Sequence, residues 1–197
     1  MTSKTEIRDL LISVIVLALA FSRFNIEIFP VMLLIIVLVF VFHELAHRYV
    51  AQRYGCFAEY RIWPIGIALS LLSALTGIIF AAPGAVYISP YSRKKSHVFA
   101  FSIAHLTRKE YGKISIAGPL TNIIVGLASL ITSFFYTLEL FLTISQISFF
   151  LAFFNLLPIF PLDGSKVMAW NMKIWITAFA VPLIGLVFLF INLALFL

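Results

Sequence analysis

The strongest constraint on this chain is the length of its uncharged apolar runs. No polar side chain occurs between Val31 and Phe42, and comparable runs recur later in the sequence. A helix needs about 20 mainly apolar residues to cross a bilayer. The chain is 62% hydrophobic and 11% charged, whereas soluble domains are about half apolar and about a quarter charged. These features indicate an integral membrane protein.

Five stretches predict spanning helices, at about residues 9–24, 30–50, 113–135, 141–160 and 174–196. The first of them is expected to be retained, because its apolar part is followed by Ser-Arg-Phe and not by the small-residue cleavage site of a signal peptide. The expected fold class is therefore an all-α polytopic membrane protein, with residues 1–197 forming a single membrane-embedded domain.

A sixth apolar stretch, residues 65–88, leaves three alternatives open. It contains Gly66, Gly77 and Pro83, and it ends in "GAVYIS", which favours a strand more than a helix. Residues 62–89 could therefore form a membrane-associated hairpin or sheet, a re-entrant helix, or a sixth spanning helix.

The distribution of basic residues favours five crossings over six. Lys and Arg gather in the cytoplasmic loops of membrane proteins. If residues 65–88 do not cross, 13 of the 14 basic residues lie on one side and only Arg23 lies on the other. A single crossing would separate the basic residues of 93–113 from those of 48–61. We therefore expect the basic loops to face the cytoplasm.

The sequence "HELAH" at residues 43–47 carries a catalytic pattern. His43 and His47 are four residues apart, so both imidazoles project from one helix face and can bind one metal ion. Glu44 points to the side, where it can act as a general base, as in H-E-x-x-H zinc hydrolases. Each ionisable group near the apolar core costs at least about 2.5 kcal/mol, which argues against chance. Arg48 is expected to snorkel to the interface.

A catalytic zinc usually takes a third protein ligand, and Asp163 is the best candidate. It lies in "FNLLPIFPLDGSKV", after the fourth predicted helix, whereas the other acidic residues fall in the N-terminal tail, in basic loops or on the opposite side. Pro158 and Pro161 break the helix and Gly164 permits a tight turn. The carboxylate could then turn inward at membrane depth.

Rival ligands and topology bear on the same assignment. His97 and His105 are alternative ligands, but they lie in a polar, basic stretch, and the single cysteine, Cys56, excludes a thiolate cluster. Two predicted helices, 113–135 and 141–160, separate the histidine motif from Asp163. An even number of crossings returns Asp163 to the side of the two histidines.

Three motifs together resemble the site-2 protease family, the intramembrane zinc metalloproteases of peptidase family M50. They are "HELAH" at 43–47, "AGPLTN" at 117–122 and "NLLPIFPLDG" at 155–164. The resemblance implies a three-helix catalytic core, at about residues 30–50, 113–135 and 141–163. It implies one Zn²⁺ ion and the following site residues: His43, His47 and Asp163 as metal ligands, Glu44 as the catalytic residue, and Asn155 as a group that binds substrate or its oxyanion.

Asn122 has two interpretations. Gly118, Asn122 and Gly126 recur every four residues, a pattern that lets membrane helices approach closely. Asn122 could therefore hydrogen-bond a neighbouring helix, or it could line the active cavity and contact substrate, as the resemblance suggests.

The expected function is hydrolysis of peptide bonds in or near transmembrane segments, as in regulated intramembrane proteolysis. The expected partners are transmembrane protein substrates and the lipid bilayer, with no nucleic acid. The expected location is the cell membrane, with multiple crossings and the site toward the cytoplasm. The alternatives are a catalytically silent scaffold or chaperone and a metal transporter that uses the same ligands.

Overall fold

A computed structural model describes residues 3–77, 79–90, 106–136 and 139–195. The elements follow one another in this order: α1 (Lys4–Phe21), α2 (Phe29–Ile36), the π-helical segment η1 (Val37–Val41), α3 (Phe42–Arg53), β1 (Cys56–Ile62), α4 (Pro64–Thr76), β2 (Gly84–Pro90), α5 (Arg108–Phe135), α6 (Glu139–Asn155), α7 (Asp163–Trp170) and α8 (Met172–Leu195).

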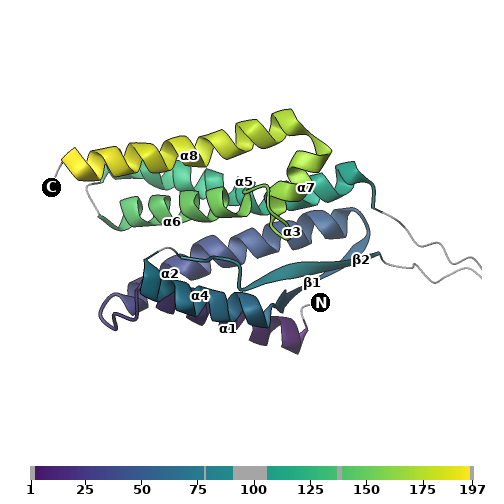
Figure 1. The fold of residues 1–197 in the computed structure, drawn as a ribbon, viewed down its shortest axis with the longest axis horizontal. Helices are drawn as coiled ribbons and strands as arrows, with labels where there is room; N and C mark the ends of the chain where they lie inside the picture. Colours follow the sequence, from purple (N-terminus) through teal and green to yellow (C-terminus); the bar gives the residue numbers. More distant parts are fainter. Residues whose placement is uncertain (1–2, 78, 91–105, 137–138, 196–197) are drawn as a thin grey trace, which may run out of the picture.

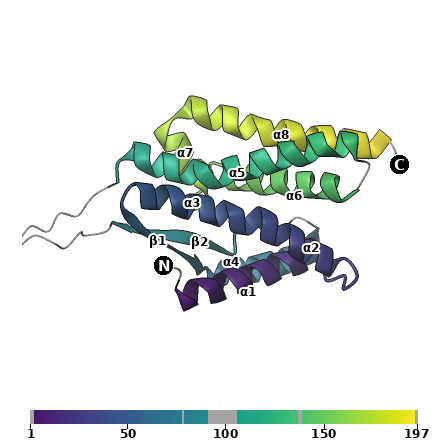
Figure 2. The ribbon, with the colours of Figure 1, turned by 180° about the vertical axis from the view of Figure 1, so that it is seen from behind.

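Most helices run along the long axis of the molecule, in two groups (Figure 1). Helices α5, α6, α7 and α8 form one group, and α1 and α4 belong to the other. Helix α3 lies between α5 and α1, as the view from behind makes clear (Figure 2). The HELAH motif is therefore carried by the central helix, which packs against both groups.

Three of the described helices are long and apolar enough to cross a bilayer: Phe29–Arg53, Arg108–Phe135 and Met172–Asn192. Two shorter apolar helices, Pro64–Thr76 and Glu139–Asn155, accompany them. The protein is therefore membrane-embedded and mostly helical, with one small sheet in the part of the chain that the structure describes.

Two helices begin earlier than the hydropathy pattern predicts, because polar residues cap them. Helix α1 starts at Lys4, not near residue 9, and the side chain of Ser3 accepts a hydrogen bond from the backbone N–H of Glu6. Helix α5 starts at Arg108, not near 113, with a capping box between Thr107 and Glu110. Apolar periodicity does not detect either extension.

The third core helix is shorter than predicted. Helix α6 ends at Asn155, whereas the sequence suggested an end near 160 or 163, and helix α7 begins only at Asp163. Pro158 and Pro161 lie in the non-helical segment between them, where their missing N–H groups cost no helical hydrogen bond. The break places Asp163 at the start of a new helix.

The pairing of β1 with β2 shows how residues 65–88 are connected to the rest of the fold. The strands are antiparallel, Ile62 lies opposite Gly84, and the N–H of Trp63 donates to the carbonyl of Pro83. The insertion that includes α4 thus leaves and rejoins the sheet at adjacent points. Within this stretch the chain forms one short helix, α4, and then the strand β2. Residues 61–69 change from strand to helix at Pro64.

Backbone direction distinguishes the two edges of this sheet. The N–H groups of Tyr60 and Ile62 in β1 point away from β2 and donate to side chains of α1. In an antiparallel pair, opposite residues either both point toward each other or both point away. The partners of Tyr60 and Ile62, Val86 and Gly84, therefore direct their N–H and C=O groups to the outer edge of β2.

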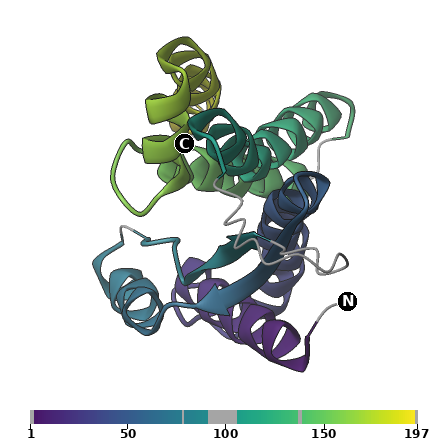
Figure 3. The ribbon, with the colours of Figure 1, turned by 90° about the vertical axis from the view of Figure 1, so that its right-hand side faces the viewer.

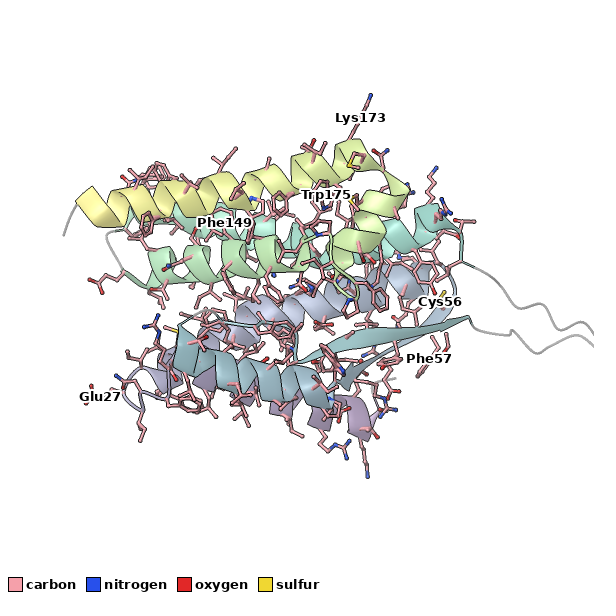
Figure 4. All side chains as sticks on the ribbon, in the orientation of Figure 1. Glu27, Cys56, Phe57, Phe149, Lys173 and Trp175 are labelled. Atoms are coloured by element: carbon pink, nitrogen blue, oxygen red, sulfur yellow. The ribbon has the colours of Figure 1, made fainter. Side chains whose placement is uncertain are left out.

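The larger helix group is held together by close packing around Phe149, which is fully buried on α6 (Figure 4). A Cβ added at Gly126 on α5 or at Gly185 on α8 would meet its ring. Two glycines therefore let three helices close on one aromatic side chain.

Candidate metal centre

The two histidines lie on α3, directly after the π-helical segment Val37–Val41. A π turn accommodates one extra residue, which rotates all following side chains by about 100° around the axis relative to an unbroken α-helix. His43, Glu44 and His47 are all buried, with at most 7% of their surface exposed. The motif therefore faces the protein interior and not lipid.

The ligand atoms of His43, His47 and Asp163 converge on one point. The Nε2 atoms of the histidines are 3.0 Å apart, and Asp163 Oδ2 lies 3.0 Å from His47 Nε2 and 3.7 Å from His43 Nε2. Zinc at about 2.0–2.1 Å from tetrahedral N and O ligands implies ligand separations of about 3.3 Å. The three atoms therefore fit three corners of a zinc tetrahedron and leave the fourth corner free.

His47 is fixed in the tautomer that a metal requires. Its Nδ1–H donates a 2.7 Å hydrogen bond to the backbone carbonyl of Ile114 on α5. The proton on Nδ1 leaves the lone pair of Nε2 available for a metal ion.

His43 has a side-chain partner, Asn122, whose amide nitrogen lies 3.0 Å from His43 Nδ1. The amide oxygen of Asn122 is buried and has no hydrogen-bond partner among the described residues. Turning the amide by 180° pairs this oxygen with the Nδ1–H of a metal-binding His43. The orphaned oxygen is thus explained if Nε2 of His43 binds a metal.

Gly118 leaves the space in which the two imidazoles meet. A Cβ at this position would overlap the Nε2 atoms of His43 and His47. Gly118 is the first residue of the pattern with a spacing of four on α5 that indicated close helix packing. What packs closely against it is the pair of imidazole rings of His43 and His47.

Asp163 is brought to the histidines by the segment between α6 and α7. Gly164 lies against the residues that follow α6, where a Cβ would overlap the carbonyl groups of Leu156 and Leu157. The indole N–H of Trp175 on α8 donates to the carbonyl of Leu156 at 2.8 Å. Lys166 lies 3.6 Å from Asp163 Oδ1, the oxygen that faces away from the histidines.

A cavity of about 560 Å³ opens beside the three ligands. Glu44 lines it together with His43, His47 and Asp163, while Gly84–Ile88 of β2 line it as well. A substrate in this cavity would contact a carboxylate, the metal ligands and a strand at once.

The other predicted site residues have different surroundings. Asn155 lines the cavity, and its amide nitrogen donates to the carbonyl of Leu151 at 2.9 Å. Asn122 does not line the cavity and contacts His43 from behind. The rival ligands His97 and His105 lie outside the described residues.

Arg48 corrects one expectation. Its side chain is folded into the protein: only 12% of it is exposed, and it forms a 2.9 Å ion pair with the buried carboxylate of Glu6 on α1. Charge pairing within the protein, and not snorkelling, accommodates this arginine at the end of α3.

Sequence reasoning missed three contributors to the centre: the π turn, the carbonyl of Ile114 and the ammonium group of Lys166. The first two leave no side-chain signal, because they are properties of the backbone. Lys166 follows Asp163 by three residues at the start of a helix, a spacing that places both side chains on one face and that could have identified it.

The fold and this site define a membrane-embedded protein built around a candidate zinc centre. A protein of Methanocaldococcus jannaschii, provisionally named a zinc metalloprotease, is 41% identical over 193 residues, which cover 93% of each chain. A zinc metalloprotease of the same organism is 29% identical over 169 residues, or 83% of this chain and 41% of that one. A provisionally named zinc metalloprotease of Bacillus subtilis is 24% identical over 163 residues, or 75% of this chain and 72% of that one.

No family model and no solved structure matches the chain. The identity to the first archaeal relative over nearly the full length of both proteins is sufficient to assign the family. The chain belongs to this family of zinc metalloproteases, and zinc is its expected cofactor.

Proposed function

We propose that this protein is an intramembrane zinc metalloprotease of the site-2 type, which hydrolyses peptide bonds in or next to transmembrane segments. The observation that carries the proposal is a single cavity lined by Glu44, by the cluster His43, His47 and Asp163, and by the open edge of β2. General base, metal ligands and a surface for an extended substrate thus face one another.

In this proposal Glu44 performs the proton transfers. Its carboxylate takes a proton from the attacking water and passes it to the leaving nitrogen as the carbonyl carbon gains an oxygen and the C–N bond breaks. A bound zinc ion would polarise the scissile carbonyl and lower the pKa of that water. Asn155 donates one amide hydrogen to the carbonyl of Leu151. Its second amide hydrogen and its amide oxygen would bind the substrate backbone.

The substrate enters as an added strand on β2. A transmembrane helix has its backbone groups paired internally, so it must unwind before its peptide bond can be attacked. Gly84, Val86 and Ile88 direct N–H and C=O groups to the outer edge of β2, which lines the cavity. Strand addition would satisfy the unwound backbone and hold it beside Glu44.

The orientation follows from charge. With 13 of the 14 basic residues on one side under the five-crossing topology, the positive-inside rule supports a multi-pass protein of the cell membrane with the metal centre toward the cytoplasm. The loop with Glu27 lies at the end of the molecule opposite Cys56, which follows α3 (Figure 4). Release of membrane-tethered substrates by regulated intramembrane proteolysis fits this arrangement.

Glu44→Gln tests the proposal on protein reconstituted in lipid with a panel of single-span peptides. The wild type should bind one zinc and cleave a member of the panel, whereas the variant should keep the zinc and lose cleavage. Glu139→Gln, an exposed change at the start of α6, serves as the control. Cleavage by the Glu44 variant would exclude Glu44 as the general base. A wild type that binds zinc but cleaves no member of the panel would instead favour the transporter or the scaffold.

Val86→Pro tests strand addition. Proline removes the N–H that faces the open edge and leaves the ladder bonds to β1 untouched. The variant should keep zinc and lose cleavage, while Val86→Thr, which keeps the N–H and the branched side chain, should stay active. If Val86→Pro cleaves as fast as Val86→Thr, strand addition is wrong, whereas the hydrolase assignment is unaffected.

A further inference from the structure

Glu6 is a buried carboxylate near the start of α1 that contacts two other elements. Its exposed fraction is 2%. One oxygen accepts a 3.3 Å hydrogen bond from the N–H of Tyr60 in β1, and the other forms the 2.9 Å ion pair with Arg48 at the end of α3. A buried charge needs such partners, since an unpaired one is costly.

The position of Arg48 on α3 connects this ion pair to the metal centre. Arg48 directly follows the metal ligand His47 on α3, whereas Tyr60 lies opposite Val86 of β2 in the sheet. Viewed along the helices, the strands lie beside both α1 and α3 (Figure 3). Glu6 thus links the helix that carries the ligands to the strand pair whose outer edge lines the cavity.

We propose that Glu6 and Arg48 are a positioning pair, which sets the distance between the open edge of β2 and the metal ligands. The proposal rests on the proposed function, because a substrate strand on β2 would present its peptide bond to Glu44 only at the correct separation. Misplacement of reacting groups by about 1 Å can cost about 100-fold in rate.

Asp9 provides a natural comparison within the same helix. It is also 2% exposed, and its Oδ2 accepts a 3.4 Å hydrogen bond from the N–H of Ile62 in β1. Its cationic partner, however, is Arg8 of α1 itself, 64% exposed, at 2.8 Å. Asp9 therefore holds β1 to α1 but makes no ion pair with α3 among the described residues.

The experiment compares Glu6→Gln with Asp9→Asn in the zinc-loaded full-length protein. Each amide keeps an oxygen for the strand N–H and loses its ion pair, so only Glu6→Gln breaks the link to α3. We expect Glu6→Gln to lower kcat by about 10- to 100-fold with KM and zinc content little changed. Asp9→Asn should stay within about twofold of the wild type, because its ion pair joins two residues of α1 and does not reach α3.

Arg48→Gln should reproduce the loss of kcat, and the double variant should be no worse than either single variant, because both changes remove one interaction. Arg48→Lys keeps the charge and should recover part of the rate. Equal kcat for Glu6→Gln and Asp9→Asn, or an additive double variant, would overturn the positioning role and assign these residues to stability alone.

Hydrogen exchange provides a measurement that needs no substrate. Glu6→Gln should speed exchange of amides around Arg48 and in β2, whereas Asp9→Asn should affect only β1 near Ile62. Unchanged exchange around Arg48 would overturn the proposal. A wild-type protein without cleavage activity would refute the proposed function instead, and the exchange result would then decide the positioning pair by itself.

Discussion

Asn122 on α5 lies directly behind His43 on α3, with its side-chain amide 3.0 Å from Nδ1, although the two residues are 79 positions apart in sequence. Asn122 is fully buried. The contact therefore belongs to the metal centre and orients an imidazole that zinc would bind on its opposite nitrogen.

Replacing Asn122 by leucine should weaken zinc binding by about 10- to 100-fold, the usual effect of removing a hydrogen bond that orients a ligating histidine. Competition with a fluorescent chelator measures the affinity. Ser148→Ala is the matched control, because Ser148 is fully buried on α6 and its hydroxyl has no partner among the described residues. Wild-type affinity in the Asn122 variant would show that the contact is incidental.

Asp163→Ala should abolish stoichiometric zinc binding, because only the two imidazoles remain of the three converging ligands. Metal analysis of the purified variant beside the wild type gives the result directly. Glu139→Ala removes an exposed carboxylate of α6 and should retain one zinc. Full zinc content in the Asp163 variant would point to a ligand outside the described residues, such as His97 or His105.

Gly118→Ala should lower zinc occupancy, since the new methyl group overlaps both Nε2 atoms. Gly126→Ala on the same helix face meets the ring of Phe149 instead, so it should reduce thermal stability while the folded fraction still binds zinc. Parallel thermal melts and metal analysis separate the two effects. If both variants lose metal in proportion to folded protein, Gly118 has only a packing role.

Trp175→Phe should remove the hydrogen bond that holds the carbonyl of Leu156, at a cost of about 1 kcal/mol. It should also weaken zinc binding, because the segment after Leu156 carries Asp163. Lys173 points away from the other helices (Figure 4), so Lys173→Ala should change neither property. If the melting temperature falls but the zinc affinity does not change, the Trp175 hydrogen bond stabilises the fold without positioning Asp163.

The helices were largely predictable because bilayer-spanning segments need long apolar runs, a signal contained in neighbouring residues. The ligand residues of the centre were predictable for a related reason: two histidines at a spacing of four share a face whatever surrounds them, and few carboxylates competed with Asp163. The parity of crossings, which led us to expect the two motifs on one side of the membrane, stays a prediction.

The remaining features depend on contacts between distant segments or on the backbone. Nothing near Arg48 in sequence indicates that its partner is Glu6, 42 residues earlier. The π turn before His43 and the carbonyl of Ile114 involve no distinctive side chain. The strand pair was ambiguous because a short apolar run is compatible with a strand or a helix until its partner is known.

The adjacency of Ile62 and Gly84 has a consequence for how this protein can vary. Because the chain departs from the sheet and rejoins it at neighbouring residues, the intervening loop is anchored at both ends independently of its content. Insertions or deletions there would change the segment between Trp63 and Ala82, which both line the cavity, while the ligand-bearing helix stays in place. This excursion can therefore change in length or composition without disturbing the three converging side chains.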